Sequence, residues 1–249
     1  MVNEIVVYTA LFGAYDELVD PIGKFENCDF ICFTDQKSLK SDVWDIKIVT
    51  DFNLTNAMMN RKFKLLPHEY LNHYEFSLYI DANILVKGNP NMLVEKYLRF
   101  ESFAVPMHLS RCCVFEEARE CLVLNRASFT KIMSQMRKYR KFGMPTGFGL
   151  SENGIMLRRH NDPVLINLML SWWHEINIET QRDQLSLPFV LWRNGKEFNF
   201  MDESIRIENK YFELNDHKHA VTKSLLGKVV FKITVMLKRA FLSFLIFKI

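Results

Sequence analysis

The chain has 249 residues, of which 49% are hydrophobic and 24% charged, with a formal net charge of +3. This composition excludes a disordered chain and can bury a full core, in one large domain or one domain with an appendage. The five cysteines are odd in number without a CxxC pair, and we expect no N-terminal signal peptide. These features favour free thiols in a reducing cytosol, with Cys28 and Cys32 as small core residues.

The positive charge is concentrated near the C-terminal end. Residues 221–249 contain six basic residues and no acidic one, which leaves 26 basic against 29 acidic residues in the body. A nucleic-acid-binding body would itself carry a basic face. The division therefore argues against nucleic acid as a partner and predicts a separate role for the tail.

The first elements predicted along the chain are three strands followed by a helical segment. The strands, rich in β-branched or aromatic residues, cover 4–11, 29–34 and 44–49. Residues 55–73 then follow the helical period, and Pro67 should kink this helix or divide it in two. One face of the helix is apolar and another is polar: Met59, Phe63, Leu66 and Tyr70 against Arg61, Lys64 and His68.

Strands and helices alternate through the rest of the body. We expect a strand at 76–85, a short helix from Asn89-Pro90, a strand at 102–107, mostly helix at 115–141, a loop at 143–149 and a strand at 154–159. A helix capped at 161–163 should bury Val164, Leu165, Leu168, Met169 and Trp172, and a further helix should begin near 182–184. This alternation predicts an α/β domain with a largely parallel sheet.

The strand at 76–85 contains the most informative motif, because its apolar run meets two oxygen-bearing side chains, Asp81 and Asn83. Polar side chains at the carboxyl end of such a strand project toward the crevice where α/β proteins bind ligands. Their oxygens suit Mg²⁺ or Mn²⁺, which a phosphate group can share. A turn without ligand is an equally good interpretation of these two residues alone.

Two basic residues on the preceding helix strengthen the case for a phosphate ligand. Arg61 and Lys64 are three residues apart, so both can reach one diphosphate, Arg in bidentate fashion and Lys as a point charge. A solvated basic face is the more common arrangement for such a pair. The combination with a cation-binding strand end, however, is useful only for a phosphate-bearing substrate.

Several other polar residues are candidates for the same crevice. The first turn has one glycine, Gly13, beside aromatic residues, which is not a dinucleotide fingerprint but could stack on a base; equally, Phe12 and Tyr15 could be core. Asp183 and Gln184 could bind sugar hydroxyls or simply cap a helix. His108 and Glu152 are further candidates. His217 and His219 fit an exposed linker better than a metal site.

Seven segments in order resemble a known family: YTALFGAYDEL, FICFTD, NRKFKLLPHEYL, SLYIDANI, HLSRCCVFEEARE, GLSENGIMLRRHN and RDQLSLPFVLW. They are similar to a glycosyltransferase-like family, first catalogued as a domain of unknown function, of bacterial surface-polysaccharide loci and plant Golgi proteins. The likeness runs from about residue 4 to about residue 200. Because order and spacing agree across seven segments, it is far more specific than any single one.

The resemblance implies a GT-A fold, Rossmann-like, with a mixed, mostly parallel sheet flanked by helices. In that fold a nucleotide-sugar lies across the carboxyl ends of the strands, and an Asp-x-Asp motif holds Mn²⁺ or Mg²⁺ on the diphosphate. Here the motif reads Asp81-Ala82-Asn83. The neutral amide keeps an oxygen donor but weakens the attraction for the cation.

The resemblance also implies roles for individual residues. Asp183 and Gln184 take the place of an Asp-Gln pair near the donor sugar in related retaining enzymes, and Glu152 joins them as a candidate catalytic residue. The candidate metal ligands are Asp81 and Asn83 from the Asp-Ala-Asn motif, with His217 and His219 added from the residues themselves. The residues implied for the nucleotide-sugar are Thr9, Ala10, Phe12, Gly13, Tyr15, Asp35, Arg61, Lys64, Asp81 and His108.

The tail mixes its basic residues with many apolar ones, but no run approaches the ~20 apolar residues needed to span a bilayer. We expect 221–249 to be an amphipathic helical segment on an anionic membrane surface, or else a docking helix for another subunit. Residues 1–220 would form the glycosyltransferase domain.

Together these features predict a cytoplasmic enzyme, peripheral on the inner face of the cell membrane. It would move a sugar from a nucleotide-diphosphate donor to a surface polysaccharide or lipid-linked glycan. The alternatives are a nucleotide-sugar or phosphoester hydrolase, and an inactive membrane-peripheral assembly protein of the same fold.

Overall fold

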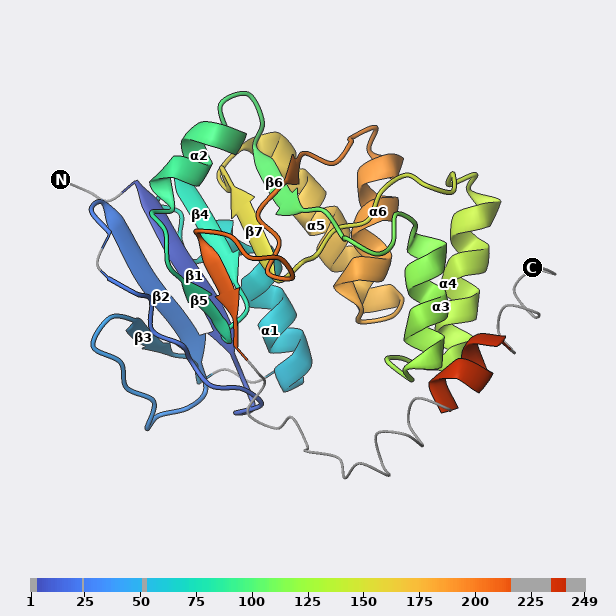
Figure 1. The fold of residues 1–249 in the computed structure, drawn as a ribbon, viewed down its shortest axis with the longest axis horizontal. Helices are drawn as coiled ribbons and strands as arrows, with labels where there is room; N and C mark the ends of the chain where they lie inside the picture. The colour runs from blue at the N-terminus through green and yellow to red at the C-terminus, as the bar shows by residue number, and fades with distance from the viewer. Residues whose placement is uncertain (1–3, 24, 51–52, 216–233, 241–249) are drawn as a thin grey trace.

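A computed structural model describes residues 4–23, 25–50, 53–215 and 234–240. Its centre is a seven-stranded sheet in the order β3-β2-β1-β4-β7-β6-β8 (Figure 1). The strands are β1 (Ile5–Leu11), β2 (Cys28–Thr34), β3 (Asp45–Ile48), β4 (Phe76–Ile80), β6 (Phe103–Pro106), β7 (Ile155–Arg158) and β8 (Phe200–Met201). A separate pair joins β5 (Ile84–Val86) to β9 (Phe212–Leu214).

The sheet is mixed and mostly parallel, as predicted. β2 and β4 run parallel to β1, β3 runs parallel to β2, and β7 is antiparallel to both β4 and β6. Every residue of β1 is buried, as expected for a central strand that is covered on both faces. The loops that follow β1, β4 and β6 therefore meet at one edge of the sheet, together with the loop that leads into β7.

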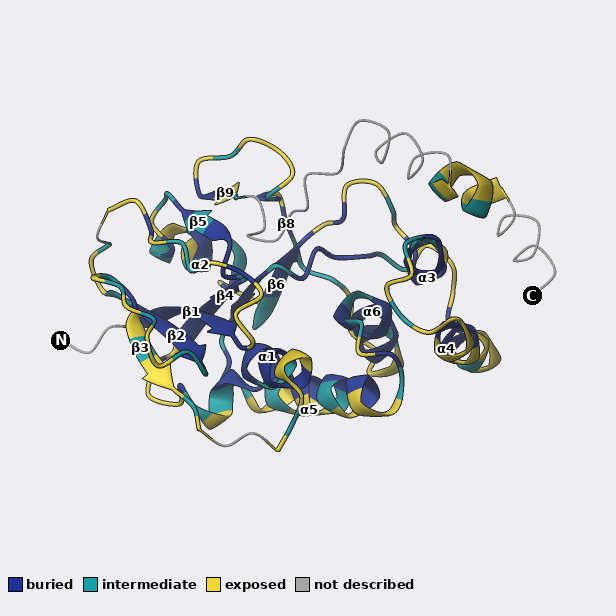
Figure 2. Ribbon diagram, turned by 90° about the horizontal axis from the view of Figure 1, so that it is seen from below, coloured by how far each residue is buried: buried dark blue, intermediate teal, exposed yellow. Residues whose placement is uncertain are grey.

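Two hydrophobic clusters lie on opposite faces of this sheet. Val6, Tyr8 and Ala10 of β1 pack with helices on one face, whereas Ile5 and Val7 pack with β5, β9 and the neighbouring helix on the other. The helices on the first face are α1 (Asn56–Leu65), α5 (Pro163–Ile178) and α6 (Asp183–Arg193), and α2 (Asn91–Tyr97) covers the second. Figure 2 shows the two layers edge-on, with buried residues between them.

A helical hairpin extends the molecule at the end remote from β3. It consists of α3 (Val114–Val123) and α4 (Phe129–Lys141), which pack with Leu185 and Phe189 of α6 in a third hydrophobic cluster. Residues 234–240, the described part of the predicted tail, are helical and lie beside this hairpin (Figure 1). Arg239 Nη2 is 2.7 Å from Glu120 Oε1 on α3.

Three details differ from the expectations. The strand predicted over 76–85 breaks into β4 and β5, because Asp81, Ala82 and Asn83 form a turn between them. Val164, expected on the buried face of α5, is exposed. The polar face of α1 is not a solvated basic face, since Lys64 is only 2% exposed. The division at Pro67 is confirmed by the short 3₁₀ helix Pro67–Glu69.

Candidate active site

A cavity of about 520 Å³ opens at the sheet edge where the loops after β1 and β4 meet the start of β7, α6 and the inner side of α3. Most of its lining is polar, and it contains several of the residues singled out in the sequence. They are Tyr15, Arg61, Lys64, Asp81, Asn83, Glu152, Asp183 and Gln184. Residues that are far apart in the chain are thus brought together as predicted.

The Asp81 side chain projects into this cavity from the turn after β4. Its Oδ1 accepts a hydrogen bond from the Tyr79 hydroxyl at 2.9 Å, and its backbone N–H donates to the Gly154 carbonyl. A Cβ at Gly154 would lie 3.1 Å from Asp81 Oδ2, so the glycine leaves room for the carboxylate. The side chain is 38% exposed and can still meet a ligand.

Two cations of α1 converge on a single carboxylate at the start of α6. Lys64 Nζ is 2.8 Å from Asp183 Oδ2 and 3.6 Å from Asp81 Oδ1, and Arg61 Nη2 is 3.8 Å from Asp183 Oδ1. Helical spacing puts both cations on one side of α1. The Lys64 and Asp183 side chains are 3% and 7% exposed, so this ion pair is largely withdrawn from water.

The electrostatics of the cluster keep its groups charged. Burial alone would raise the pKa of Asp183, but Arg61, Lys64 and Arg182 outweigh burial and hold that pKa well below its usual range. Burial also acts to lower the pKa of Arg61, yet Asp183 raises it above the ordinary value. The cavity therefore presents fixed positive charge beside a permanently ionised carboxylate.

The two tyrosines of the cavity carry neutral hydroxyls. Burial, aided by the Asp81 carboxylate, raises the pKa of both Tyr15 and Tyr79 above the ordinary range. Tyr15 nevertheless remains 43% exposed at the mouth of the cavity. Its ring is thus accessible for stacking.

Gln184 is held at the start of α6 with its amide committed to the wall of the cavity. Its Nε2 donates to the Ser151 carbonyl at 3.1 Å, and Arg182 Nη2 approaches its Oε1 at 3.5 Å. Asp183 Oδ1 accepts from the Gln184 backbone N–H at 3.1 Å. Because carboxylates are favoured at a helix N-terminus, Asp183 also stabilises α6.

Glu152 and His108 come from the loop that leads into β7 and the loop that follows β6. Glu152 is buried and paired with Arg206 at 2.5 Å, and its Oε2 accepts from the Ser204 hydroxyl at 2.7 Å. His108 does not line the cavity, but its Nε2 is 2.8 Å from Nη2 of Arg111, which does. Burial, with Arg111 and Arg206, lowers the pKa of His108 to about 4, so the ring is neutral at pH 7.

The predicted nucleotide residues of the first turn are divided between core and surface. Thr9, Ala10 and Phe12 are buried, and Phe12 stacks on Phe63 at 5.3 Å between ring centroids, so the core reading suits these side chains. The Gly13 N–H donates to both Asp35 carboxylate oxygens at 3.1 Å. Gly13 has φ +82 and a Cβ there would lie 2.5 Å from Asn56, which explains the glycine.

The metal ligands predicted in the sequence are only partly within the described residues. Asn83 is buried, and its amide nitrogen donates to the Asn215 carbonyl at 2.9 Å. Among residues that the structure describes, no cluster of three or more His, Cys, Asp or Glu side chains is arranged to hold a metal. His217 and His219 lie outside those residues. The involvement of Asp81 and Asn83 in metal binding stays a prediction.

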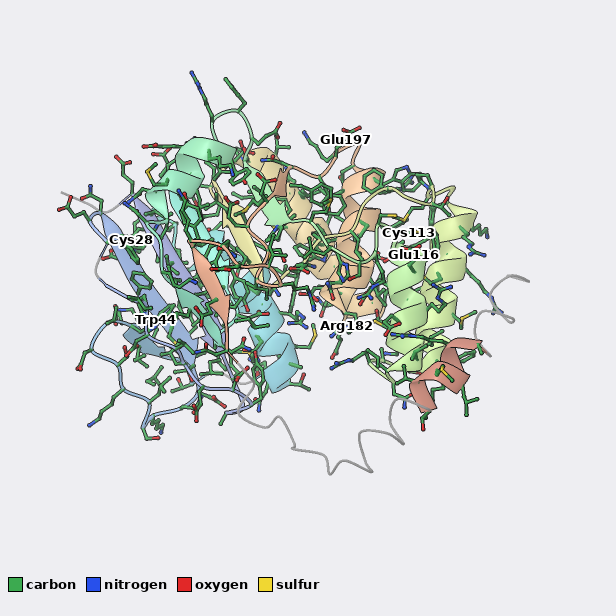
Figure 3. All side chains as sticks on the ribbon, in the orientation of Figure 1. Cys28, Trp44, Cys113, Glu116, Arg182 and Glu197 are labelled. Carbon is green, nitrogen blue, oxygen red and sulfur yellow. The ribbon has the colours of Figure 1, made fainter. Side chains whose placement is uncertain are left out.

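Two arginines of the site, Arg182 and Arg158, have no individual role among the residues predicted from the sequence. Arg182 precedes α6 and lies between α1 and α3 (Figure 3), and its Nε is buried without a hydrogen bond. Arg158 of β7 is fully buried, and its Nη1 donates to the Lys64 carbonyl at 2.9 Å. It thereby holds the last turn of α1, from which Lys64 reaches the cavity. An arginine at the end of the strand IMLR gives no local signal of such a partner.

No helix among residues 4–215 and 234–240 combines the length and apolar character needed to cross a membrane. The five cysteines are unpaired, with Cys32, Cys113 and Cys121 buried.

Comparisons with known proteins agree with this architecture. A family model described as TOD1/MUCI70, glycosyltransferase-like domain, matches residues 1–217. The chain is 26% identical over 214 residues to the probable hexosyltransferase MUCI70 of Arabidopsis thaliana, which covers 75% of this chain and 37% of that protein. It is also 26% identical over 222 residues to alkaline ceramidase TOD1 of the same plant, and this match covers 75% of this chain and 48% of that protein. The chain thus spans less than half the length of these relatives.

Among solved structures, the chain is similar to the apo structure of the bifunctional glycosyltransferase WbbM. The TM-score is 0.50 at 11% identity, over 80% of this chain and 38% of that one. This likeness concerns the fold alone and, together with the sheet order, confirms the predicted GT-A-like architecture.

Proposed function

The chain belongs to the TOD1/MUCI70 glycosyltransferase-like domain family, and on this premise we propose that it transfers a sugar from a nucleoside-diphosphate sugar to a glycan acceptor. The observation that carries the proposal is the pair of cations formed by the buried Lys64 and the half-buried Arg61, beside the turn of Asp81. A site built to hold fixed positive charge at the open edge of an α/β sheet suits a diphosphate.

Both cations keep hydrogen-bonding capacity for a ligand. The ammonium of Lys64 has three donors, and the Arg61 Nε is buried without a hydrogen bond. A diphosphate that enters the cavity would satisfy these donors and compete with Asp183 for them. When the sugar bond breaks, the departing diphosphate gains negative charge, which preorganised cations stabilise.

The nucleoside would lie toward the loops after β1 and β2. Tyr15 offers an exposed ring for the base, and the carboxylate of Asp35, already ordered by Gly13, offers acceptors for ribose hydroxyls. The core positions Thr9, Ala10 and Phe12 would act by shaping this loop rather than by contact.

The donor sugar would lie between the start of α6 and the start of β7. Asp183 and Gln184 line this part of the cavity, and Glu152 faces it from the β7 side. Asp183 is the ionised group best placed to accept sugar hydroxyls or to stabilise a positively charged transition state. This arrangement is compatible with retention of anomeric configuration, which we propose on the likeness of the Asp-Gln pair.

A divalent cation, Mg²⁺ or Mn²⁺, is proposed as the cofactor, held by Asp81 and Asn83 with His217 or His219. When bound, it would neutralise charge on the diphosphate. Arg61 and Lys64 would also neutralise charge on the diphosphate, so weak activity is expected without added metal.

We further propose residues 1–220 as the catalytic domain and 221–249 as a tail that holds it on the cytoplasmic face of an anionic membrane. The six basic residues of the tail support this assignment. The acceptor would then be a surface polysaccharide or a lipid-linked glycan at that face.

Ligand-induced thermal stabilisation tests the donor site, since a ligand that binds the folded state raises its melting temperature. Uridine and guanosine diphosphates should stabilise the full chain more than their nucleosides. Arg61→Ala should abolish this difference, whereas Arg159→Ala, a control at a half-buried arginine outside the cavity, should preserve it. Equal stabilisation of wild type by diphosphates and nucleosides, or an undiminished difference between them in Arg61→Ala, would contradict the proposal.

A further inference from the structure

The outer side of the α3–α4 hairpin combines positive charge with an apolar groove. Residues 121–151 contain six basic residues and no acidic one. Outside 121–151 and the tail, 221–249, the chain has 20 basic against 29 acidic residues. The charge of the body is therefore strongly polarised toward this hairpin.

The groove runs between the two helices on the side away from the cavity. Its apolar floor is formed by Phe115, Ala118, Leu122, Met133 and Met136, and its rim by Arg119, Arg137 and Arg140. None of these three arginines forms an ion pair within the described residues, and the Arg140 guanidinium lies over the Phe115 ring at 5.0 Å. Phe129, at the start of α4, is 55% exposed.

The orientation of this face is set by the packing of the hairpin. Ile132, Gln135 and Tyr139 of α4 are buried toward the body, where Tyr139 stacks on Phe189 of α6. The opposite side of α4 is exposed at the end of the molecule remote from β3 (Figure 2). Val235 of the described tail packs against the hydrophobic cluster of the hairpin, whereas Arg119, Arg137 and Arg140 remain exposed.

We infer that this face docks on an anionic phospholipid surface. Basic side chains around an apolar groove suit the boundary between phosphate headgroups and acyl chains, where arginine stems lie along the apolar surface. Nucleic acid or a polyanionic glycan would match the charge but not the apolar floor. The basic tail helix reaches the same hairpin, where Arg239 pairs with Glu120 and Lys238 Nζ is 3.1 Å from Asn125 Oδ1.

Docking in this way would hold the cavity close to the membrane, on the other side of α3 from the headgroups. Glu117, Cys121 and Leu124 line the cavity from the inner side of α3, whereas Arg119 and Leu122 lie on its outer groove. A single helix, about 10 Å across, separates the two. If the proposed function holds, a lipid-linked acceptor would reach the donor sugar close to the headgroups. The membrane contact itself does not depend on that function.

Vesicle flotation with the full chain tests the inference. Wild type should float with phosphatidylcholine vesicles that contain about one third phosphatidylglycerol, and not with phosphatidylcholine alone. The variant with Arg119→Gln, Arg137→Gln and Arg140→Gln should bind about a hundredfold more weakly. A control with Lys37→Gln, Lys40→Gln and Lys196→Gln removes as much charge from other exposed positions and should bind as wild type does.

A second variant guards against misfolding, because Arg140 contacts Phe115. Arg137→Glu with Lys141→Glu reverses two exposed charges of α4 and should weaken flotation at least as much. Flotation of both variants at the wild-type level would overturn the inference. So would binding of wild type to heparin or DNA without binding to anionic vesicles. Because no nucleotide-sugar is present, failure of the sugar-transfer proposal leaves this result unaffected.

Discussion

Replacing Lys64 with Met should weaken both the folded state and diphosphate binding, because one side chain serves both. Lys64 is 2% exposed and lies 2.8 Å from Asp183 Oδ2. Its ammonium also lies 4.9 Å from the centroid of the Tyr79 ring. Methionine keeps much of the side-chain volume but leaves the buried Asp183 carboxylate with Arg61 at 3.8 Å as its nearest cation on α1.

Breaking a buried ion pair by removing one partner costs about 3–5 kcal/mol. Since Arg61 remains near Asp183, we expect Lys64→Met to lose unfolding free energy at the lower end of that range, about 3 kcal/mol. Urea unfolding at pH 7 measures this loss. Asp183→Asn should lose less stability, because Lys64 Nζ still lies 3.6 Å from Asp81 Oδ1. The double variant should lose less unfolding free energy than the two single variants lose in sum, by at least about 1 kcal/mol.

The matched control is Lys62→Met, on the same helix but over the Tyr70 ring, which should change stability by no more than about 0.5 kcal/mol. Calorimetry with a nucleoside diphosphate should show weaker binding for Lys64→Met and for the double variant, but not for Lys62→Met. Strictly additive losses in the cycle, or unchanged diphosphate affinity in the folded double variant, would refute this reasoning.

Three further predictions follow from the site. Gly154→Ala places a Cβ 3.1 Å from Asp81 Oδ2, so turnover should fall while the melting temperature changes little; wild-type turnover would show that Asp81 moves freely. Asn83→Asp should raise Mn²⁺ affinity in calorimetric titrations but lose the bond to Asn215, at about 1–3 kcal/mol of stability, and unchanged Mn²⁺ affinity would leave position 83 a turn residue. The pKa of His108, lowered to about 4 by burial, is below the unfolded value of about 6.5, so stability should fall as pH drops between these values; urea unfolding of His108→Asn should show a smaller fall, and an equal one would contradict the assignment.

The sheet could be predicted from the sequence because its strands carry continuous apolar runs with turn formers between them. β1 and β2 are such runs, and they lie within two residues of the predicted bounds. The break of 76–85 at Asp81 was missed because Ile84 and Val86 continue the apolar pattern, although they pair with β9 rather than with the main sheet.

The cavity was only partly predictable, because its decisive contacts are long-range. In the sequence Lys64 resembles an exposed lysine, because its partner Asp183 lies more than a hundred residues later and comes beside it only in the fold. Arg158 is buried against the carbonyl of Lys64, a contact with no local sequence signature. The wall contributed by α3 depends on how the hairpin packs on α6, which periodicity alone does not determine.

The measurement that tests the central claim most directly is release of nucleoside diphosphate from a panel of nucleotide-sugars, followed with the full chain in the presence of Mn²⁺ and candidate glycan acceptors. We predict acceptor-stimulated release from at least one donor, abolished by Asp81→Ala and depressed by Asp183→Asn with little change in donor affinity. Absence of release and of binding for every donor, with and without Mn²⁺, would contradict the assignment of this cavity as a glycosyltransferase site.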